Sequence, residues 1–191
     1  MKSAALNVLT LTVLSGFLLS ACDAGRVEPQ MDWQPPAWEL IDAKGEAFRY
    51  PEDLDGPAVV LFWASWCPYC KALMPYLKTI VEERGGDVPV LALNIRDDED
   101  PRTFMAENGF EFRLFHGADP VAEAWGVKST PGLFLVDAEG RAVFSNYAIP
   151  AEDYPEDVQG LVEELKHWEE AAIKAPFWAE YLRHAIDRTL L

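Results

Sequence analysis

The sequence predicts one α/β domain in which a mixed central sheet is flanked by helices. The chain has 191 residues, of which 50% are hydrophobic and 25% charged, as in globular proteins. Residues 58–63 form a continuous apolar run, which is typical of a strand buried on both faces. Strands alternate with helical segments through the front part, and a hairpin follows near the end.

The first 21 residues have the pattern of an export signal. Lys2 precedes an apolar stretch that is shorter than the roughly 20 residues of a membrane span. The stretch ends in Leu19-Ser20-Ala21-Cys22, which resembles the lipobox of bacterial lipoproteins. That resemblance implies a signal peptide at 1–21 and lipidation of Cys22, whose several acyl chains would give stable anchoring. An ordinary cleaved signal and an uncleaved membrane helix are the alternatives.

Charge and composition narrow the partners. The formal net charge of −16 argues against nucleic acid and against adhesion to anionic lipids through a basic face, so attachment to a membrane depends on the lipid. Asp23, directly after the lipidated cysteine, resembles an inner-membrane retention signal, which implies the periplasmic side of that membrane. The proline-containing residues 22–36 are expected to be a tether, and 37–191 the domain. Trp33 and Trp38 mark where packing begins.

The elements before the central strand and after it can be placed from turn and cap residues. Residues 38–41 and 47–50 form a hairpin that precedes the central strand at 58–63, and a helix runs from about Pro68 to Arg84. The later elements, in order, are a strand at 88–94, a helix from Asp100-Pro101 to Gly109, a strand at 110–115, a short helix from Asp119-Pro120 to Gly126, and a hairpin of 132–136 with 142–145.

The C-terminal part is predicted to hold two helices. The first begins at Asp157 and lays an apolar stripe on the sheet, formed by Val158, Leu161, Val162, Leu165 and Trp168. Pro176 is expected to end it. The residues after Pro176 then form an extra C-terminal helix.

The motif Cys67-Pro68-Tyr69-Cys70 follows the central strand directly. A C-x-x-C pair can be half of a zinc site, a structural disulfide or a redox motif. Zinc is disfavoured because there is no second C-x-x-C and the three histidines lack ligand spacing, so we expect no metal. For redox chemistry, Cys67 lies where the helix begins, so unpaired N–H groups and the helix dipole favour its thiolate. We therefore expect Cys67, and not Cys70, to face solvent as the accessible thiol of low pKa. Cys70, one turn later, can resolve a mixed disulfide.

Residues 62–70 resemble the active-site run of thioredoxins, and residues 126–137 resemble their cis-proline segment and next strand. The likeness covers about residues 36–170. It implies a thioredoxin-like fold, a cis Pro131 beside the cysteines, and Thr130 offering backbone hydrogen bonds to a substrate. Trp66 resembles the partly exposed tryptophan beside the site, with Pro68 and Tyr69 also part of it.

The chain also differs from thioredoxin. A helix and a strand are inserted before the cis-proline segment, which, with the first hairpin and the anchor, is similar to the TlpA/ResA-like branch. Leu61 stands where thioredoxins carry a buried acid, so the proton acceptor for Cys70 is unassigned. The Pro68-Tyr69 pair is similar to that of glutaredoxins, which leaves glutathione open as a substrate.

The leading hypothesis is a cofactor-free thiol:disulfide oxidoreductase that reduces disulfides in exported proteins. Cys67 is the nucleophile and Cys70 the resolving thiol, and by resemblance a membrane electron donor keeps them reduced, with cytochrome c maturation as one such pathway. A net oxidant or isomerase is the alternative within this chemistry. A binding module that performs no catalysis, and a peroxidase, are alternatives from other classes.

Overall fold

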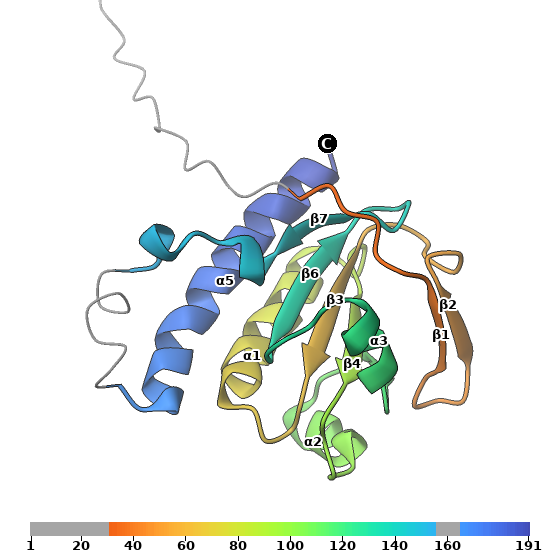
Figure 1. Cartoon of the computed structure of the whole chain (residues 1–191), viewed down its shortest axis with the longest axis horizontal. Helices are drawn as coiled ribbons and strands as arrows, with labels where there is room; N and C mark the ends of the chain where they lie inside the picture. Colours follow the sequence, from red (N-terminus) through yellow and green to blue (C-terminus); the bar gives the residue numbers. More distant parts are fainter. Residues whose placement is uncertain (1–30, 156–164) are drawn as a thin grey trace, which may run out of the picture.

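The computed structural model describes residues 31–155 and 165–191 (Figure 1). Five strands form one sheet in the order β5-β4-β3-β6-β7, and β1 pairs with β2 in a separate hairpin. The strands are β1 (Trp38–Ile41), β2 (Ala47–Tyr50), β3 (Ala58–Trp63), β4 (Val90–Asn94), β5 (Arg113–Phe115), β6 (Gly132–Val136) and β7 (Ala142–Ser145). The helices are α1 (Pro68–Glu83), α2 (Pro101–Asn108), α3 (Asp119–Ala124) and α5 (His167–Thr189), with 3-10 turns η1 (Asn146–Ala148) and η2 (Ala151–Asp153).

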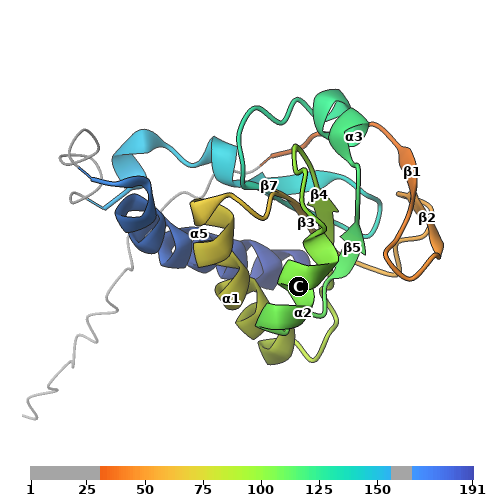
Figure 2. The ribbon, with the colours of Figure 1, turned by 90° about the horizontal axis from the view of Figure 1, so that it is seen from below.

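The sheet is mixed around its central strand. β3 runs parallel to β4, with Val59 opposite Val90, and antiparallel to β6, with Leu61 opposite Leu133. Because side chains alternate along a strand, successive residues of β3 belong to two different cores. Figure 2 shows α1, α2 and α5 on one side of the sheet and α3 on the other. The predicted fold class is confirmed.

The face toward α3 is packed with aromatic rings. The ring of Trp125 lies 5.2 Å from Tyr50, 5.4 Å from Phe62 and 5.5 Å from Phe134, between ring centroids. Trp33 joins them at 5.8 Å from Trp125. Its backbone pairs with Ala142 of β7, so packing begins inside the segment that the sequence assigned to the tether.

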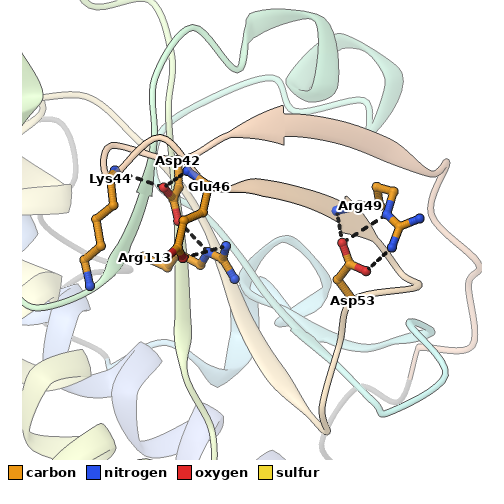
Figure 3. Close-up of polar contacts among 6 residues, drawn as sticks. All are labelled: Asp42, Lys44, Glu46, Arg49, Asp53 and Arg113. Atoms are coloured by element: carbon orange, nitrogen blue, oxygen red, sulfur yellow. Dashed lines mark hydrogen bonds and ion pairs between the residues drawn. The ribbon is translucent and has the colours of Figure 1, made fainter.

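The hairpin is fastened to the sheet by a buried carboxylate (Figure 3). One oxygen of Asp42 accepts hydrogen bonds from the backbone N–H groups of Lys44 and Glu46, each at 2.9 Å. The other accepts from Nε of Arg113 on β5, also at 2.9 Å. Burial raises the pKa of Asp42, but these hydrogen bonds outweigh it and hold the pKa below its ordinary value. The guanidinium of Arg113 also lies 4.7 Å from the Phe48 ring centroid.

The opposite face is covered by α1 and α5, which lie side by side (Figures 1 and 2). Ala175 and Ala179 of α5 are fully buried. At the far end, Arg183 pairs with Glu83, with 2.9 Å between Nε and Oε2. The predicted break at Pro176 is wrong, because α5 continues through this residue. Packing against α1 on both sides of Pro176 offsets the loss of one helical hydrogen bond.

The start of the predicted C-terminal helix also needs correction. Val158, Leu161 and Val162 lie outside the described residues, and Leu165 precedes α5 instead of being part of a helix. Trp168, expected in the apolar stripe, is 60% exposed, because it lies in the first turn of α5 on the side away from the core. Strands β4 and β5 are shorter at their starts than predicted, and Ala118, not Asp119, is the N-cap of α3.

Within residues 31–155 and 165–191, no helix combines the length and apolarity that a membrane crossing needs.

Candidate active site

The two cysteines lie at the junction between β3 and α1. Cys67 is the N-cap of α1 in an extended conformation, and Pro68 occupies the first turn, where its missing N–H has no helical partner to lose. The sulfur of Cys67 accepts a hydrogen bond from the backbone N–H of Cys70 at 3.2 Å. This is a capping interaction made by a sulfur atom.

The pKa values of the two thiols are shifted in opposite directions. A hydrogen bond from the Cys70 side chain, outweighing burial, and further bonds from the backbone N–H groups of Cys70 and Tyr69 lower the pKa of Cys67 to about 6. Burial raises the pKa of Cys70 well above its ordinary value, and the neighbouring Cys67 raises it further. The two shifts have opposite directions, so Cys67 is the thiol of the pair that ionises first.

Cys67 is not the solvent-facing residue that the sequence led us to expect. It is only 1% exposed, and Cys70 is 0% exposed. The cause is the loop before β6, since the Cys67 sulfur lies 3.5 Å from the carbonyl oxygen of Thr130. The Thr130 carbonyl therefore helps to shield the Cys67 sulfur from solvent.

The loop before β6, which faces the cysteines, is held by side chains that follow β7. The Thr130–Pro131 peptide bond is cis, and Pro131 is buried. Asn146 donates from Nδ2 to the Pro131 carbonyl at 3.0 Å and accepts from the Leu133 N–H at 2.9 Å. Tyr147 donates its hydroxyl to the carbonyl of Ser129. The structure thus brings together two motifs that are 63 residues apart.

Tyr69, between the cysteines, is linked to the C-terminal helix. Its hydroxyl donates to Oε2 of Glu170 on α5 at 2.5 Å, and lies 3.3 Å from Nδ1 of His167. The other oxygen of Glu170 forms an ion pair with Lys174. Glu170 is 7% exposed; burial raises its pKa, but Lys174 and Tyr69 outweigh this and lower it. Burial and then Glu170 raise the pKa of Tyr69.

Trp66 is 56% exposed beside the site, and its Nε1 donates to the carbonyl of Arg96 at 2.7 Å. A cavity of about 370 Å³ opens next to the cysteine motif, between the Pro131 loop and α5. Its lining includes four aromatic side chains and one cation: Tyr69, Ser129, Thr130, Pro131, Asn146, Tyr147, Ile149, Tyr154, Lys174 and Trp178. A larger cavity, of about 730 Å³, lies between the N-terminal segment and the end of α5 and includes neither cysteine.

Two residues close to the cysteine motif in the sequence, Leu61 and Lys71, lie in different environments. Leu61 is fully buried in the core under α1, so an apolar side chain fills the position at which thioredoxins carry an acid. Lys71 is exposed, and its Nζ lies 5.7 Å from the Phe104 ring centroid. Its backbone N–H donates to the carbonyl of Cys67 at 3.1 Å. In the part of the chain that the structure describes, no three His, Cys, Asp or Glu side chains gather as a metal site.

The sequence reasoning missed two acidic residues of the site, Glu170 and Asp97. Asp97 accepts hydrogen bonds from the backbone N–H and the hydroxyl of Ser65, two residues before Cys67. Asp97 follows the end of β4, and polar residues at the carboxyl ends of parallel strands are a known signal of a site. Glu170 gives a weaker signal, since its partner Lys174 is four residues later and the pair reads as an ordinary exposed helix pair.

Comparison with known proteins gives the family. The sequence model of the AhpC/TSA family matches residues 32–144. A thiol:disulfide interchange protein DsbE homolog of Paracoccus denitrificans is 38% identical over 120 residues, which are 60% of this chain and 62% of the relative. HelX, a thiol:disulfide interchange protein of Rhodobacter capsulatus, is 34% identical over 114 residues, 56% of this chain and 62% of HelX. The chain thus spans about three fifths of these relatives.

Solved structures show the same fold. The thioredoxin domain of a thiol-disulfide oxidoreductase from Bacteroides vulgatus superposes with a TM-score of 0.55 at 21% identity, covering 70% of this chain and 96% of that domain. A thio-disulfide isomerase from Thermus thermophilus has a TM-score of 0.50 at 30% identity, covering 69% and 94%. The protein therefore has a thioredoxin-like fold and belongs to the AhpC/TSA family.

Proposed function

We propose that this protein is a thiol:disulfide oxidoreductase that reduces disulfides in exported proteins. The observation that carries the proposal is the Cys67 sulfur, held at the amino end of α1 with a lowered pKa and 3.5 Å from the Thr130 carbonyl. The named activities of the DsbE homolog and of HelX support the same chemistry.

The reaction needs only the two cysteines. The Cys67 thiolate attacks one sulfur of the substrate disulfide, and the other substrate sulfur leaves as a thiolate that takes up a proton. Cys70 then loses its proton and attacks the Cys67 sulfur, releasing the second substrate thiol. Two electrons pass to the substrate, and Cys67 and Cys70 end as a disulfide. No cofactor enters these steps, and a membrane electron donor of the thiol-reductase type would return the pair to the reduced form.

The groove for the substrate would be formed by both motifs. Trp66, Pro68 and Tyr69 form one side, and Thr130 with the cis Pro131 forms the other. The cavity of about 370 Å³ is lined by three of these residues, Tyr69, Thr130 and Pro131. An extended substrate segment would displace the Thr130 contact from the Cys67 sulfur, so that the Cys67 thiolate can attack the substrate disulfide.

The same proposal includes the location. Cys22, outside the described residues, would carry the lipid, residues 1–21 would be removed, and the domain would face the periplasm from the inner membrane. Cys22→Ala should release the protein from the membrane fraction or leave an unprocessed precursor. A variant that still fractionates as mature, membrane-bound protein would contradict the anchor.

Two experiments test the activity. The purified domain should reduce insulin with dithiothreitol as donor, and Cys67→Ser should abolish this. Cys70→Ser should accumulate mixed disulfides with exported proteins, which mass spectrometry can identify, including apocytochromes c. A domain that binds partners but reduces no insulin would support the binding-module alternative instead.

The alternative to net reduction is that the protein acts as a net oxidant or an isomerase. A thiolate pKa of about 6 lies between the value of about 7 for thioredoxin and about 3.5 for the oxidant DsbA. The named isomerase from Thermus thermophilus keeps the alternative open. We expect a potential between about −200 and −270 mV, which a glutathione redox titration would measure; a value near −120 mV would indicate a net oxidant.

A further inference from the structure

Outside the two motifs, one two-residue segment touches both halves of the active site. Arg96 and Asp97 follow the end of β4, where Arg96 adopts the left-handed region with φ of 51°. This conformation is uncommon for a residue with a side chain. It directs the carbonyl of Arg96 and the carboxylate of Asp97 toward the loop before Cys67.

Asp97 holds that loop with both of its oxygens. Its Oδ2 accepts from the backbone N–H of Ser65 at 2.5 Å, and its Oδ1 accepts from the Ser65 hydroxyl at 2.9 Å. Oδ2 also accepts from Nδ2 of the buried Asn94 at 2.8 Å, and Oδ1 from the Glu99 N–H at 3.3 Å. Every contact is a donor, so only a carboxylate can accept all four.

Arg96 holds the other half of the active site, the loop with Thr130 and Pro131. Its guanidinium donates to the carbonyls of Val127 at 2.9 Å and Lys128 at 3.3 Å, just before Thr130 and Pro131. Its own N–H donates to Oδ1 of Asp119 at 3.0 Å. The Ser65 turn and the Pro131 loop are therefore tied to consecutive residues.

We infer that Asp97 and Arg96 are positioning residues that set the approach of the Cys67 sulfur to the Thr130–Pro131 loop. This inference rests on the proposed function for its catalytic consequence. Asp97 touches neither cysteine and acts through Ser65, two residues before the nucleophile. Releasing the turn moves the Cys67 sulfur relative to the Cys70 N–H that stabilises its thiolate.

The test for Asp97 is Asp97→Asn, with Asp98→Asn as the matched control on an exposed neighbour. In this variant an NH₂ group replaces one carboxylate oxygen of Asp97, and it cannot accept hydrogen bonds from the donors around it. The turn at Ser65 therefore loosens, and the Cys67 thiolate loses stabilisation. The iodoacetamide rate of Cys67 at pH 6 should fall about three-fold, with the plateau above pH 9 unchanged. Loss of a nearby negative charge alone would act oppositely and raise that rate. An unchanged or higher rate at pH 6 would overturn the positioning role.

Ser65→Ala keeps the hydrogen bond from the Ser65 backbone N–H to Asp97 and removes only the bond from the hydroxyl. This variant tests the inference if Asp97→Asn does not fold. It should lower the pH 6 rate in the same direction by a smaller factor, and a rate equal to wild type would contradict the inference. Combined with Asp97→Asn, its effect should be less than additive.

For Arg96, the test is Arg96→Lys, which keeps the charge but removes the planar fork that bonds two carbonyls. The KM for a protein disulfide should rise about three- to ten-fold with kcat changed less than about two-fold, because the loop that orients the substrate is loosened. Arg102→Lys, an exposed arginine bonded only to Asp100 among the contacts described, is the control. Equal KM values for Arg96→Lys and wild type would overturn this arm. If wild type reduces no disulfide, the proposed function fails, while the alkylation test still decides the role of Asp97.

Discussion

The face of the sheet under the β1–β2 hairpin is closed by aromatic rings, whereas the face under α1 and α5 carries the cysteines at its edge. Trp125 packs against the rings of Tyr50, Phe62 and Phe134 on the first face, and Asp42 ties the hairpin to β5. On the second face, Glu170 of α5 contacts the cysteine motif through Tyr69. We conclude that the first face mainly stabilises the fold, while the second can adjust the chemistry.

The largest effect that this comparison predicts is on stability, from the hairpin face. Trp125→Ala should lower the free energy of unfolding by about 3–5 kcal/mol, because a buried indole and its ring contacts are lost. Trp168→Ala, at a 60% exposed tryptophan on α5, should change it by less than about 0.5 kcal/mol. Chemical denaturation measures both. Similar losses for the two variants would contradict the division between the faces.

The second prediction concerns the anchor of the hairpin. Asp42→Asn should cost about 1–3 kcal/mol at pH 7, since the buried amide leaves donors around it without acceptors. The pKa of Asp42 is lowered in the folded state, so its contribution is present above the unfolded pKa of about 3.9 and is lost as pH falls through the lower folded value. The stability gap between wild type and variant should therefore narrow below about pH 4. A gap that is constant from pH 7 to pH 3 would contradict the ionised role of Asp42.

The third prediction is smaller and concerns the α5 face. Glu170→Gln replaces the charged acceptor of the Tyr69 hydroxyl with a neutral one and removes the partner of Lys174. The kcat/KM for a protein disulfide should fall about three- to five-fold, because a charge-assisted hydrogen bond is roughly twice as strong as a neutral one. Glu180→Gln, at an exposed position of the same helix, is the control. Identical kinetics for both variants would remove α5 from the chemistry.

Much of the fold follows from local patterns. The apolar run at 58–63 marks the central strand, and cap and turn residues place α1, α2 and the β6–β7 hairpin within a few residues. The cysteine motif could be placed at the amino end of a helix because Pro68 is favourable only in the first turn. These features depend on residues that are close together in the sequence.

Other features depend on tertiary contacts and could not be read in this way. Pro176 ends a helix by local rules, yet α5 continues because buried alanines pack on α1. The burial of Cys67 follows from a loop 63 residues away. Asp97 and Glu170 are acidic residues among 32 in the chain, and only the fold distinguishes their hydrogen-bond partners.

The central claim is that Cys67 and not Cys70 is the reactive thiolate. The most direct measurement is the iodoacetamide labelling rate of the fully reduced wild-type protein between pH 4 and pH 9, with the alkylated cysteine located by peptide mass mapping. We predict labelling at Cys67 with a midpoint of about 6, and no comparable labelling of Cys70, whose pKa is raised by burial. Labelling at Cys70 first, or a Cys67 midpoint at the unperturbed value of about 8.5, would contradict the account.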